Sequence, residues 1–146
     1  MSMYTIGFTQ KPAERFFTLL RNNHVLRVVD VRLNNVSQLA GFAKRDDLKF
    51  FLRELCGAEY VHAAVLAPEQ ADLKAYKNKE MSWDEYESRF LDLMTRRHIE
   101  TEFSPSDLEG ACLLCSEHKP HHCHRRLVAE YLNTHWSSKI GVKHLF

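Results

Sequence analysis

The 146-residue sequence lacks any run of about 18 apolar residues that could span a membrane. Its first residues, Met1–Phe8, lack the basic region and the long apolar run of a secretory signal peptide. An excess of charge is also missing, since 20 Lys and Arg face 19 Asp and Glu for a net charge of +1. We therefore expect no membrane partner and no global attraction for nucleic acid, so any anion binding must be local.

Cysteine is sparse, with four residues in the chain. Without a secretory signal, so few cysteines are typical of reduced thiols rather than of a disulfide framework, and we expect a cytoplasmic location. The sequence contains no internal repeat, low-complexity tract or linker. We expect residues 1–146 to form a single domain, because this length is a common one for single domains.

Short apolar runs alternate with segments of helical periodicity along the chain. The predicted strands cover residues 3–6, 25–31, 59–63 and 110–115, and residues 142–146 form a last strand or an extended tail. The predicted helices cover residues 12–23, 46–56, 82–97 and a segment that starts at Cys123 or His124, and residues 66–80 are left as a connection that holds a short helix. We expect Asp46 to cap the second helix, which carries Leu48, Phe51, Leu52 and Leu55 at helical spacing, and we interpret Trp83, Tyr86, Phe90 and Met94 as a core-facing stripe.

This alternation predicts an α/β fold with a single, mostly parallel sheet flanked by helices, in a Rossmann-like three-layer arrangement. In such sheets, ligands bind where the carboxyl ends of the strands meet the following loops. The rule selects Gly7–Thr9, Asp30–Arg32 and the loop after Cys115. Chemically active side chains stand at the last two of these places.

Asp30 and Arg32 end a strongly apolar strand. Because they lie two residues apart, their side chains point in the same direction. Charged side chains are rarely buried without a partner, so the pair indicates a functional site. A surface salt bridge, or an aspartate that caps a nearby loop, is the alternative.

The segment Cys115–Arg125 concentrates reactive side chains, with two cysteines, one glutamate and four of the nine histidines of the chain. Pro120 breaks regular structure, so a loop that turns into a helix near Cys123 is predicted. The free amides and the dipole of that helix, together with Arg125, are expected to lower the pKa of the Cys123 thiol. The same groups suit a phosphate or a carboxylate.

Three interpretations of this loop stay open. In the first, it is an anion pocket in an enzyme, where Arg125 holds an oxyanion and Cys115, Glu117, Cys123 or a histidine performs the chemistry. In the second, its side chains bind a divalent metal such as zinc, although seven residues separate the two cysteines, unlike common zinc knuckles. In the third, the cysteines are structural and the histidines are solvated. Cys112 is set apart from Cys115, because residues three apart on a strand point to opposite faces.

These motifs resemble those of the family known as domain of unknown function 488. The resemblance rests on Thr5–Gly7, Asp30–Arg32 and Tyr60–His62, and most specifically on the pattern Cys-x-Glu-x-x-Pro-x-x-Cys-His-Arg over residues 115–125. It extends over nearly the whole chain. It implies an α/β fold and the pairing of the Asp-Val-Arg and Cys-His-Arg motifs, but no established reaction.

Two segments depart from the family pattern. Phe8-Thr9 stands where the family often has a His-Ser pair, and Leu33–Gln38 stands where the family often has Pro and Arg. If those family positions hold ligand or catalytic groups, the resemblance implies an altered or lost activity in this chain.

We therefore expect a small cytoplasmic enzyme that acts on a phosphate-bearing or other anionic substrate, such as a nucleotide. The expected substrate-binding residues are Arg32, His124 and Arg125. The catalytic candidates are Asp30, Cys115, Glu117 and Cys123. The alternative is a non-catalytic module that binds a nucleotide, a nucleic acid or a protein partner through the same pocket, with or without a structural metal, although the net charge gives nucleic acid no support.

Overall fold

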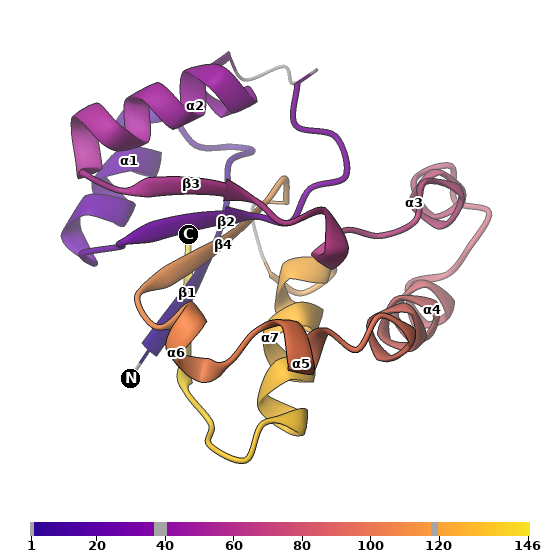
Figure 1. Cartoon of the computed structure of the whole chain (residues 1–146). Coiled ribbons are helices and arrows are strands. Elements are labelled where there is room, and N and C mark those ends of the chain that lie inside the picture. Colours follow the sequence, from indigo (N-terminus) through magenta and orange to yellow (C-terminus); the bar gives the residue numbers. More distant parts are fainter. Residues whose placement is uncertain (1, 37–40, 118–119) are drawn as a thin grey trace.

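A single parallel sheet forms the centre of the molecule (Figure 1). The structure is a computed structural model that describes residues 2–36, 41–117 and 120–146. All five described strands are parallel, in the order β3-β2-β4-β1-β5. They are β1 (Ser2–Gly7), β2 (Arg27–Asp30), β3 (Glu59–His62), β4 (Ala111–Cys115) and β5 (Gly141–Leu145). The predicted α/β class and the predicted last strand are confirmed, whereas β1 and β4 are exchanged relative to the doubly wound order 3-2-1-4-5-6.

Helices cover both faces of the sheet (Figure 1). They are α1 (Ala13–Asn22), α2 (Arg45–Phe51), α3 (Gln70–Lys77), α4 (Trp83–Arg96), α5 (Ile99–Glu102), α6 (Pro105–Leu108) and α7 (His124–His135). Successive strand residues face opposite layers: Val28 packs in the core under α1 and α2, and Val29 packs in the core under α4 and α7. Cys112 and Cys115 likewise belong to different cores, as their spacing predicts.

The connections after neighbouring strands leave the sheet on opposite sides. The chain passes from β2 to α2 on one face, and from β4 to α7 on the other face. Because β2 and β4 are adjacent, their carboxyl ends border a crevice between the two departing segments. The two polar motifs, Asp30–Arg32 and Cys115–Arg125, begin at the last residues of these two strands.

The second helix differs from its sequence prediction at both ends. Lys44 occupies the N-cap and makes no side-chain cap, so the prediction of Asp46 as the cap is wrong. Asp46 lies in the first turn, where its negative charge interacts favourably with the positive end of the helix dipole. After Phe51 the helix widens into a π-helical turn, Leu52–Cys56, that ends at the left-handed Gly57. The wider turn rotates the last residues off the apolar face, and Leu55 is 45% exposed.

The long connection between β3 and β4 is helical over most of its length. It contains the short helix predicted within residues 66–80, now α3, and the predicted helix α4, whose N-cap Ser82 accepts a hydrogen bond from the Glu85 amide. Two further short helices, α5 and α6, were not predicted from the sequence. In the described part of the chain, no helix is long and apolar enough to cross a membrane.

Candidate functional site

A cavity of about 220 Å³ opens beyond the carboxyl ends of β2 and β4. Side chains from the β2 loop, α3, α4 and the loop before α7 enclose it. Its lining includes Arg32, Leu33, Asn34, Leu73, Tyr76, Lys77, Trp83, Tyr86, Cys115, Ser116, Glu117, His122, Cys123 and His124. A hollow of about 250 Å³ between α1 and α2 has a mainly apolar lining, so the concentration of reactive groups favours the first cavity as the functional site.

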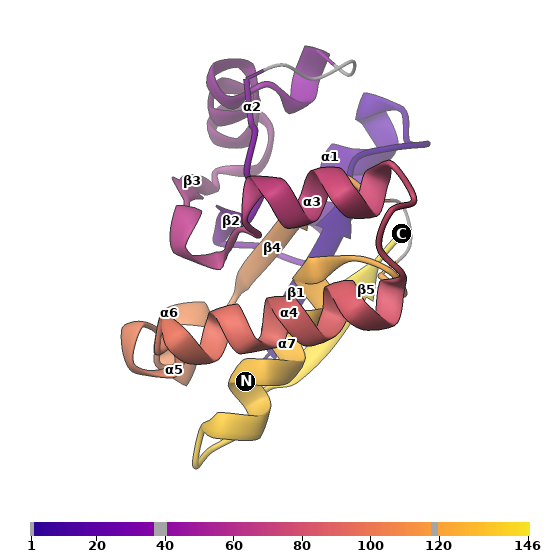
Figure 2. The ribbon, with the colours of Figure 1, turned by 90° about the vertical axis from the view of Figure 1, so that its right-hand side faces the viewer.

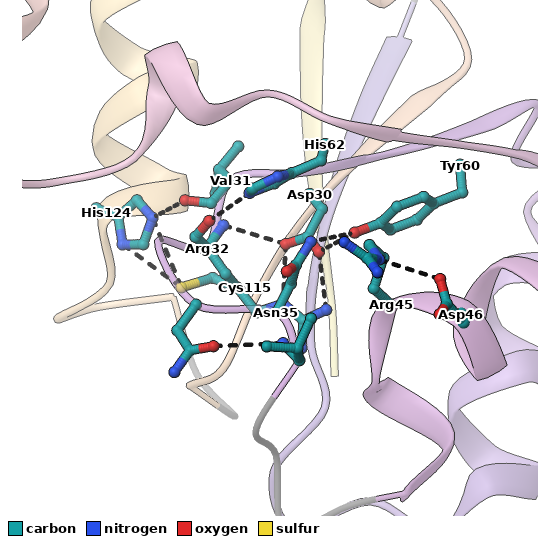
Figure 3. A network of polar contacts seen from close by, with 12 residues as sticks. Asp30, Val31, Arg32, Asn35, Arg45, Asp46, Tyr60, His62, Cys115 and His124 are labelled. Atoms are coloured by element: carbon teal, nitrogen blue, oxygen red, sulfur yellow. Dashed lines mark hydrogen bonds and ion pairs between the residues drawn. The ribbon is translucent and has the colours of Figure 1, made fainter.

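Asp30 and Arg32 form a buried ion pair at the end of β2 (Figure 3). Arg32 Nε and Nη2 donate to the two carboxylate oxygens of Asp30 at 2.8 Å each, and the Arg32 amide donates at 3.1 Å. The Tyr60 hydroxyl donates to the same carboxylate at 2.5 Å. Burial and this hydrogen bond raise the pKa of Tyr60 to about 12, so Tyr60 stays a donor at neutral pH. The pair is therefore not a surface salt bridge. Asp30 does cap the start of the following loop through the Arg32 amide, and the same carboxylate holds the Arg32 guanidinium.

One nitrogen of the Arg32 guanidinium, Nη1, takes no part in the ion pair with Asp30. Arg32 is 2% exposed, and its Nη1 is the one buried side-chain nitrogen or oxygen without a hydrogen-bond partner in the described part of the structure. The Phe8 ring covers the guanidinium at 5.3 Å from its central carbon. Leaving a buried donor unpaired costs about 1–3 kcal/mol, so such an atom calls for a partner that a ligand or water can supply.

Cys115 and His124 meet at the floor of the cavity (Figure 3). His124 Nε2 lies 2.7 Å from the Val31 carbonyl oxygen, which can only accept, so Nε2 carries the proton of the neutral ring. Cys115 Sγ lies 3.4 Å from His124 Nδ1 and 3.8 Å from Nε2, so the thiol lies against the imidazole ring rather than at the lone pair of one nitrogen. The Val31 carbonyl, directly after β2, thus sets the tautomer and the position of the histidine ring beside this thiol.

The two thiols of the site differ in acidity. A hydrogen bond from Cys123 lowers the pKa of Cys115, and the Ser116 backbone and Arg125 act in the same direction against the effect of burial. Burial, followed by the hydrogen bond that it gives to Cys115, raises the pKa of Cys123 well above its ordinary value. The expectation of a lowered pKa at Cys123 is therefore wrong, although Cys123 does occupy the predicted N-cap of α7. Near-complete burial of Cys123 outweighs the helix dipole, and Cys115 is the more acidic of the two thiols.

Arg125 lies behind the cavity rather than among its lining residues. It is fully buried, and its Nε donates to the Thr5 hydroxyl at 3.3 Å, while its Nη1 donates to the Glu117 carbonyl. These contacts tie the loop after β4 to β1. A Cβ at position 7 would overlap the Glu117 carbonyl, so only glycine allows the loop to pass β1 this closely. The geometry gives Arg125 a loop-holding function, and its predicted contact with a substrate stays a prediction.

The two segments that depart from the family pattern contribute to the site in different ways. Phe8 packs over the Arg32 guanidinium, and the Thr9 hydroxyl donates to the Ser116 carbonyl at 2.7 Å. Both residues therefore support the cavity that the family motifs form. In the second segment Leu33 and Asn34 line the cavity, whereas Ser37 and Gln38 lie outside the described residues, as do His118 and Lys119 of the later loop.

The same residues have the composition of a metal centre. Ligand atoms of Cys115, Cys123 and His124 all lie within 4.8 Å of one another, and all three residues are buried. Two thiolates and an imidazole suit zinc, and three protein ligands leave a fourth position open to the cavity. The Val31 carbonyl on Nε2 is the kind of outer contact that orients a metal-bound histidine. The arrangement can thus serve either as a thiol–imidazole pair or as a zinc site.

Sequence reasoning missed the aromatic wall of the cavity. Trp83 packs against the core as predicted, but it is only half-buried and also lines the cavity, where it stacks on His122 at 4.8 Å between ring centroids. Tyr86, Phe90 and Met94 are buried as predicted. Tyr76 of α3 stacks on Tyr86 at 4.8 Å. Tyr60, which completes the Asp30 site, belongs to the Tyr60–His62 motif of the family resemblance, but no contact with Asp30 was predicted for it.

Comparison with known families finds a match to the family described as domain of unknown function DUF488, over residues 12–132. This range contains both polar motifs and every cavity-lining residue named above. Neither the curated proteins nor the solved structures give a match to the chain.

Proposed function

The chain belongs to the family of domain of unknown function DUF488, and from that premise we propose that it is a cytoplasmic enzyme acting on an anionic, phosphate-bearing substrate in the cavity between β2 and β4. The observation that carries the proposal is Arg32 Nη1, an unpartnered, buried donor on a residue that lines a cavity beside a thiol–imidazole pair. Guanidinium donors bind phosphate and carboxylate oxygens strongly and with defined direction.

The charges around the cavity favour an anion held in one orientation over a general electrostatic attraction of anions. Asp30 neutralises Arg32, so Nη1 contributes a directed hydrogen bond more than a net field. Lys77 adds a positive charge to the cavity, while Glu117 adds a negative one. The substrate would therefore be selected by the position of its anionic oxygen, with Arg32 as the fixed point.

Cys115 is the group that we propose to react. Its lowered pKa favours the thiolate, and the His124 imidazole packs against its sulfur, with Nδ1 at 3.4 Å and Nε2 at 3.8 Å. Cys123 stays a thiol and donates to Cys115, which makes it a positioning residue. Glu117 lines the cavity and remains the acid–base candidate closest to solvent.

A zinc-dependent version is the second candidate, and the cluster of three ligand atoms favours it. Zinc bound there would supply a Lewis acid next to the anion, and Cys115 would then be a ligand instead of the nucleophile. Metal content of the purified protein decides between the versions: one equivalent of zinc, lost in Cys123→Ser, supports the metal centre. Protein without zinc that takes up none on titration leaves the thiol version.

Anion binding at Arg32 is the first property to test. Alanine at this position would leave Asp30 buried and unpaired, so Arg32→Lys is the better variant: it keeps the charge and loses the planar fork that carries Nη1. Calorimetric titration with inorganic phosphate should show binding that weakens at least about tenfold in Arg32→Lys.

Arg53→Lys is the matched control, because Arg53 also lies over a phenylalanine ring, at Phe50, but is exposed and pairs with Glu54. It should bind phosphate as the unmodified protein does. Equal phosphate affinity in Arg32→Lys and Arg53→Lys would overturn the proposal, as would a complete lack of phosphate binding in the unmodified protein.

A further inference from the structure

We propose, resting on the function proposed above, that the phosphate of the substrate is carried on a planar aromatic ring that packs against Tyr76 and Trp83. The cavity has two unlike sides. Arg32, Cys115 and His124 form a polar side at the ends of the strands, and aromatic side chains of α3 and α4 form the other side. A ligand that uses the whole cavity needs an anionic end and an apolar, flat end.

The aromatic side is a connected group of rings. Tyr76 stacks on Tyr86 at 4.8 Å and meets Trp83 edge-on at 5.5 Å, and Trp83 stacks on His122 at 4.8 Å. Of these, Tyr86 is 2% exposed and belongs to the core, whereas Tyr76 and Trp83 are only half-buried. Ring surface is therefore left uncovered on the side of the cavity, where a further ring could add offset-stacked or edge-to-face contacts.

Helix α3 is held in position by few contacts, so a ligand that packs against it would add to its burial. None of its eight residues is buried. Figures 1 and 2 show it beside α4 and away from the sheet, and its contacts run to α4, through Tyr76 and through an ion pair of Asp72 with Arg89 at 2.9 Å. Leu73, Tyr76 and Lys77 of this helix all line the cavity. A bound ring would complete the burial of the apolar residues among them.

The size of the cavity limits the ligand. A space of about 220 Å³ suits one small ring system with a single anionic group better than an extended cofactor. Lys77 also lines the cavity, from the aromatic side, where its ammonium group would attract a negative charge on the ligand. The chemical class is therefore a compact aromatic or heteroaromatic monophosphate.

A matched pair of ligands tests the ring without altering the protein. Phenyl phosphate and cyclohexyl phosphate carry the same anion on six-membered rings of similar size, but only the first is flat and aromatic. Calorimetric titration of the unmodified protein should give at least about fivefold tighter binding of phenyl phosphate, since stacking of a planar ring on aromatic side chains has measurable strength.

The variant Tyr76→Leu should remove this preference, so that phenyl phosphate and cyclohexyl phosphate bind to it with equal affinity. Phe50→Leu is its control, because Phe50 is an aromatic residue, 49% exposed, on helix α2 of the opposite layer. Thermal melting checks that both variants are folded. If Tyr76→Leu is unfolded, the comparison of the two ligands on the unmodified protein still tests the proposal.

The outcomes separate this inference from the function on which it rests. Equal affinity for the two ring phosphates, with phosphate binding that depends on Arg32, would overturn the aromatic class and leave the anion site in place. Failure of all three phosphates to bind would overturn both proposals. A preference for phenyl phosphate that survives in Tyr76→Leu but is lost in Phe50→Leu would place the ring elsewhere and overturn the assignment to this cavity.

Discussion

At the scale of single residues, the buried pair of Asp30 and Arg32 holds the polar side of the cavity in position. We expect Arg32→Ala to lower the free energy of unfolding by about 3–5 kcal/mol, because it leaves a buried carboxylate without its partner. The double variant Asp30→Asn/Arg32→Leu should lose less than the single one, since no buried charge remains. Urea denaturation followed by circular dichroism measures both.

The exposed pair of Arg53 and Glu54 provides the comparison. Arg53→Ala should change the free energy of unfolding by less than about 1 kcal/mol, because exposed ion pairs contribute little. If Arg32→Ala were as mild as Arg53→Ala, the Asp30 carboxyl could not be the buried, fully engaged group described above.

The acidity of the two site thiols gives a prediction in pH. Thiolates react with iodoacetamide and thiols do not, so a lowered pKa moves the onset of alkylation to lower pH and a raised pKa moves it to higher pH. Cys115 should therefore be modified with a midpoint below the ordinary thiol pKa of 9.0, and Cys123 with a midpoint above it. Peptide mass spectrometry after short pulses, between pH 6 and about 10, reads each cysteine separately.

Pulses with and without a chelator distinguish the two versions of the site. If Cys115 reacts only after chelation, it is a metal ligand in the purified protein. Cys56, whose pKa is raised by burial, serves as an internal reference on the opposite layer. Faster modification of Cys123 than of Cys115 at neutral pH, in chelated protein, would contradict the assigned acidities.

The residues of the site were predictable from the sequence to the extent that they lie at strand ends. Asp30, Arg32, Cys115 and His124 were found because the ends of parallel strands converge, and the structure brings them together. The order of acidity between Cys115 and Cys123 was not, because it depends on burial and on which thiol donates to the other. The hydrogen bond from Tyr60 to Asp30 was not predictable either, because the two residues lie 30 positions apart on different strands.

At the scale of elements, the close passage of the loop after β4 over β1 depends on Gly7. We expect Gly7→Ala to lower the free energy of unfolding by about 1–3 kcal/mol, because the added methyl group overlaps the Glu117 carbonyl and must displace the loop. The same variant should weaken phosphate binding, since the displaced loop carries Ser116 and Glu117, which line the cavity. Thermal unfolding and calorimetric titration measure the two effects.

Gly41→Ala is the matched control. A Cβ at Gly41 meets no described atom within 4 Å, so this variant should be neutral or slightly stabilising. Equal effects of the two substitutions would show that chain stiffness, and not the contact with Glu117, explains the loss at position 7.

Helix boundaries were less predictable than helix positions. The periodicity of Leu48, Phe51 and Leu52 located α2, but nothing in the residue pattern signals the π-helical turn that follows. Helices α5 and α6 are only four residues long and too short for a periodic pattern. A signal for α6 did exist, since Ser104 and Asp107 form a reciprocal capping box around Pro105.

At the scale of the whole molecule, stability should be uneven. Helix α3 buries no residue, whereas β4 is buried along its whole length in the middle of the sheet. We expect amide hydrogens of α3 to exchange through openings of low free energy, and those of β4 only through global unfolding. Hydrogen exchange read by mass spectrometry measures both, and added phenyl phosphate should slow exchange in α3 selectively. Protection of α3 equal to that of β4 in free protein would contradict this ranking.

The α/β class was predictable from the alternation of strand and helix patterns along the chain. The three layers were predictable because apolar strands of this kind are buried on both faces, and the structure has a hydrophobic core on each face of the sheet. The strand order did not follow, because several orders satisfy the same alternation. The position of β1 between β4 and β5 depends on pairings between segments more than 100 residues apart, as in Thr5 with Leu113 and with His144.

That placement of β1 bears on how the protein is made. Strand β1 leaves the ribosome before the rest of the sheet, yet both of its hydrogen-bonding neighbours lie more than 100 residues further along the chain, at Ala111–Cys115 and Gly141–Leu145. At a synthesis rate of about 5–20 residues per second, β1 waits several seconds with its apolar residues unpaired. Thr5 and Gly7, which secure the loop of the site, are in that strand. The cavity therefore cannot be completed until β4 has been made and has paired with β1, and a nascent chain released before residue 141 would still lack the other neighbour of β1.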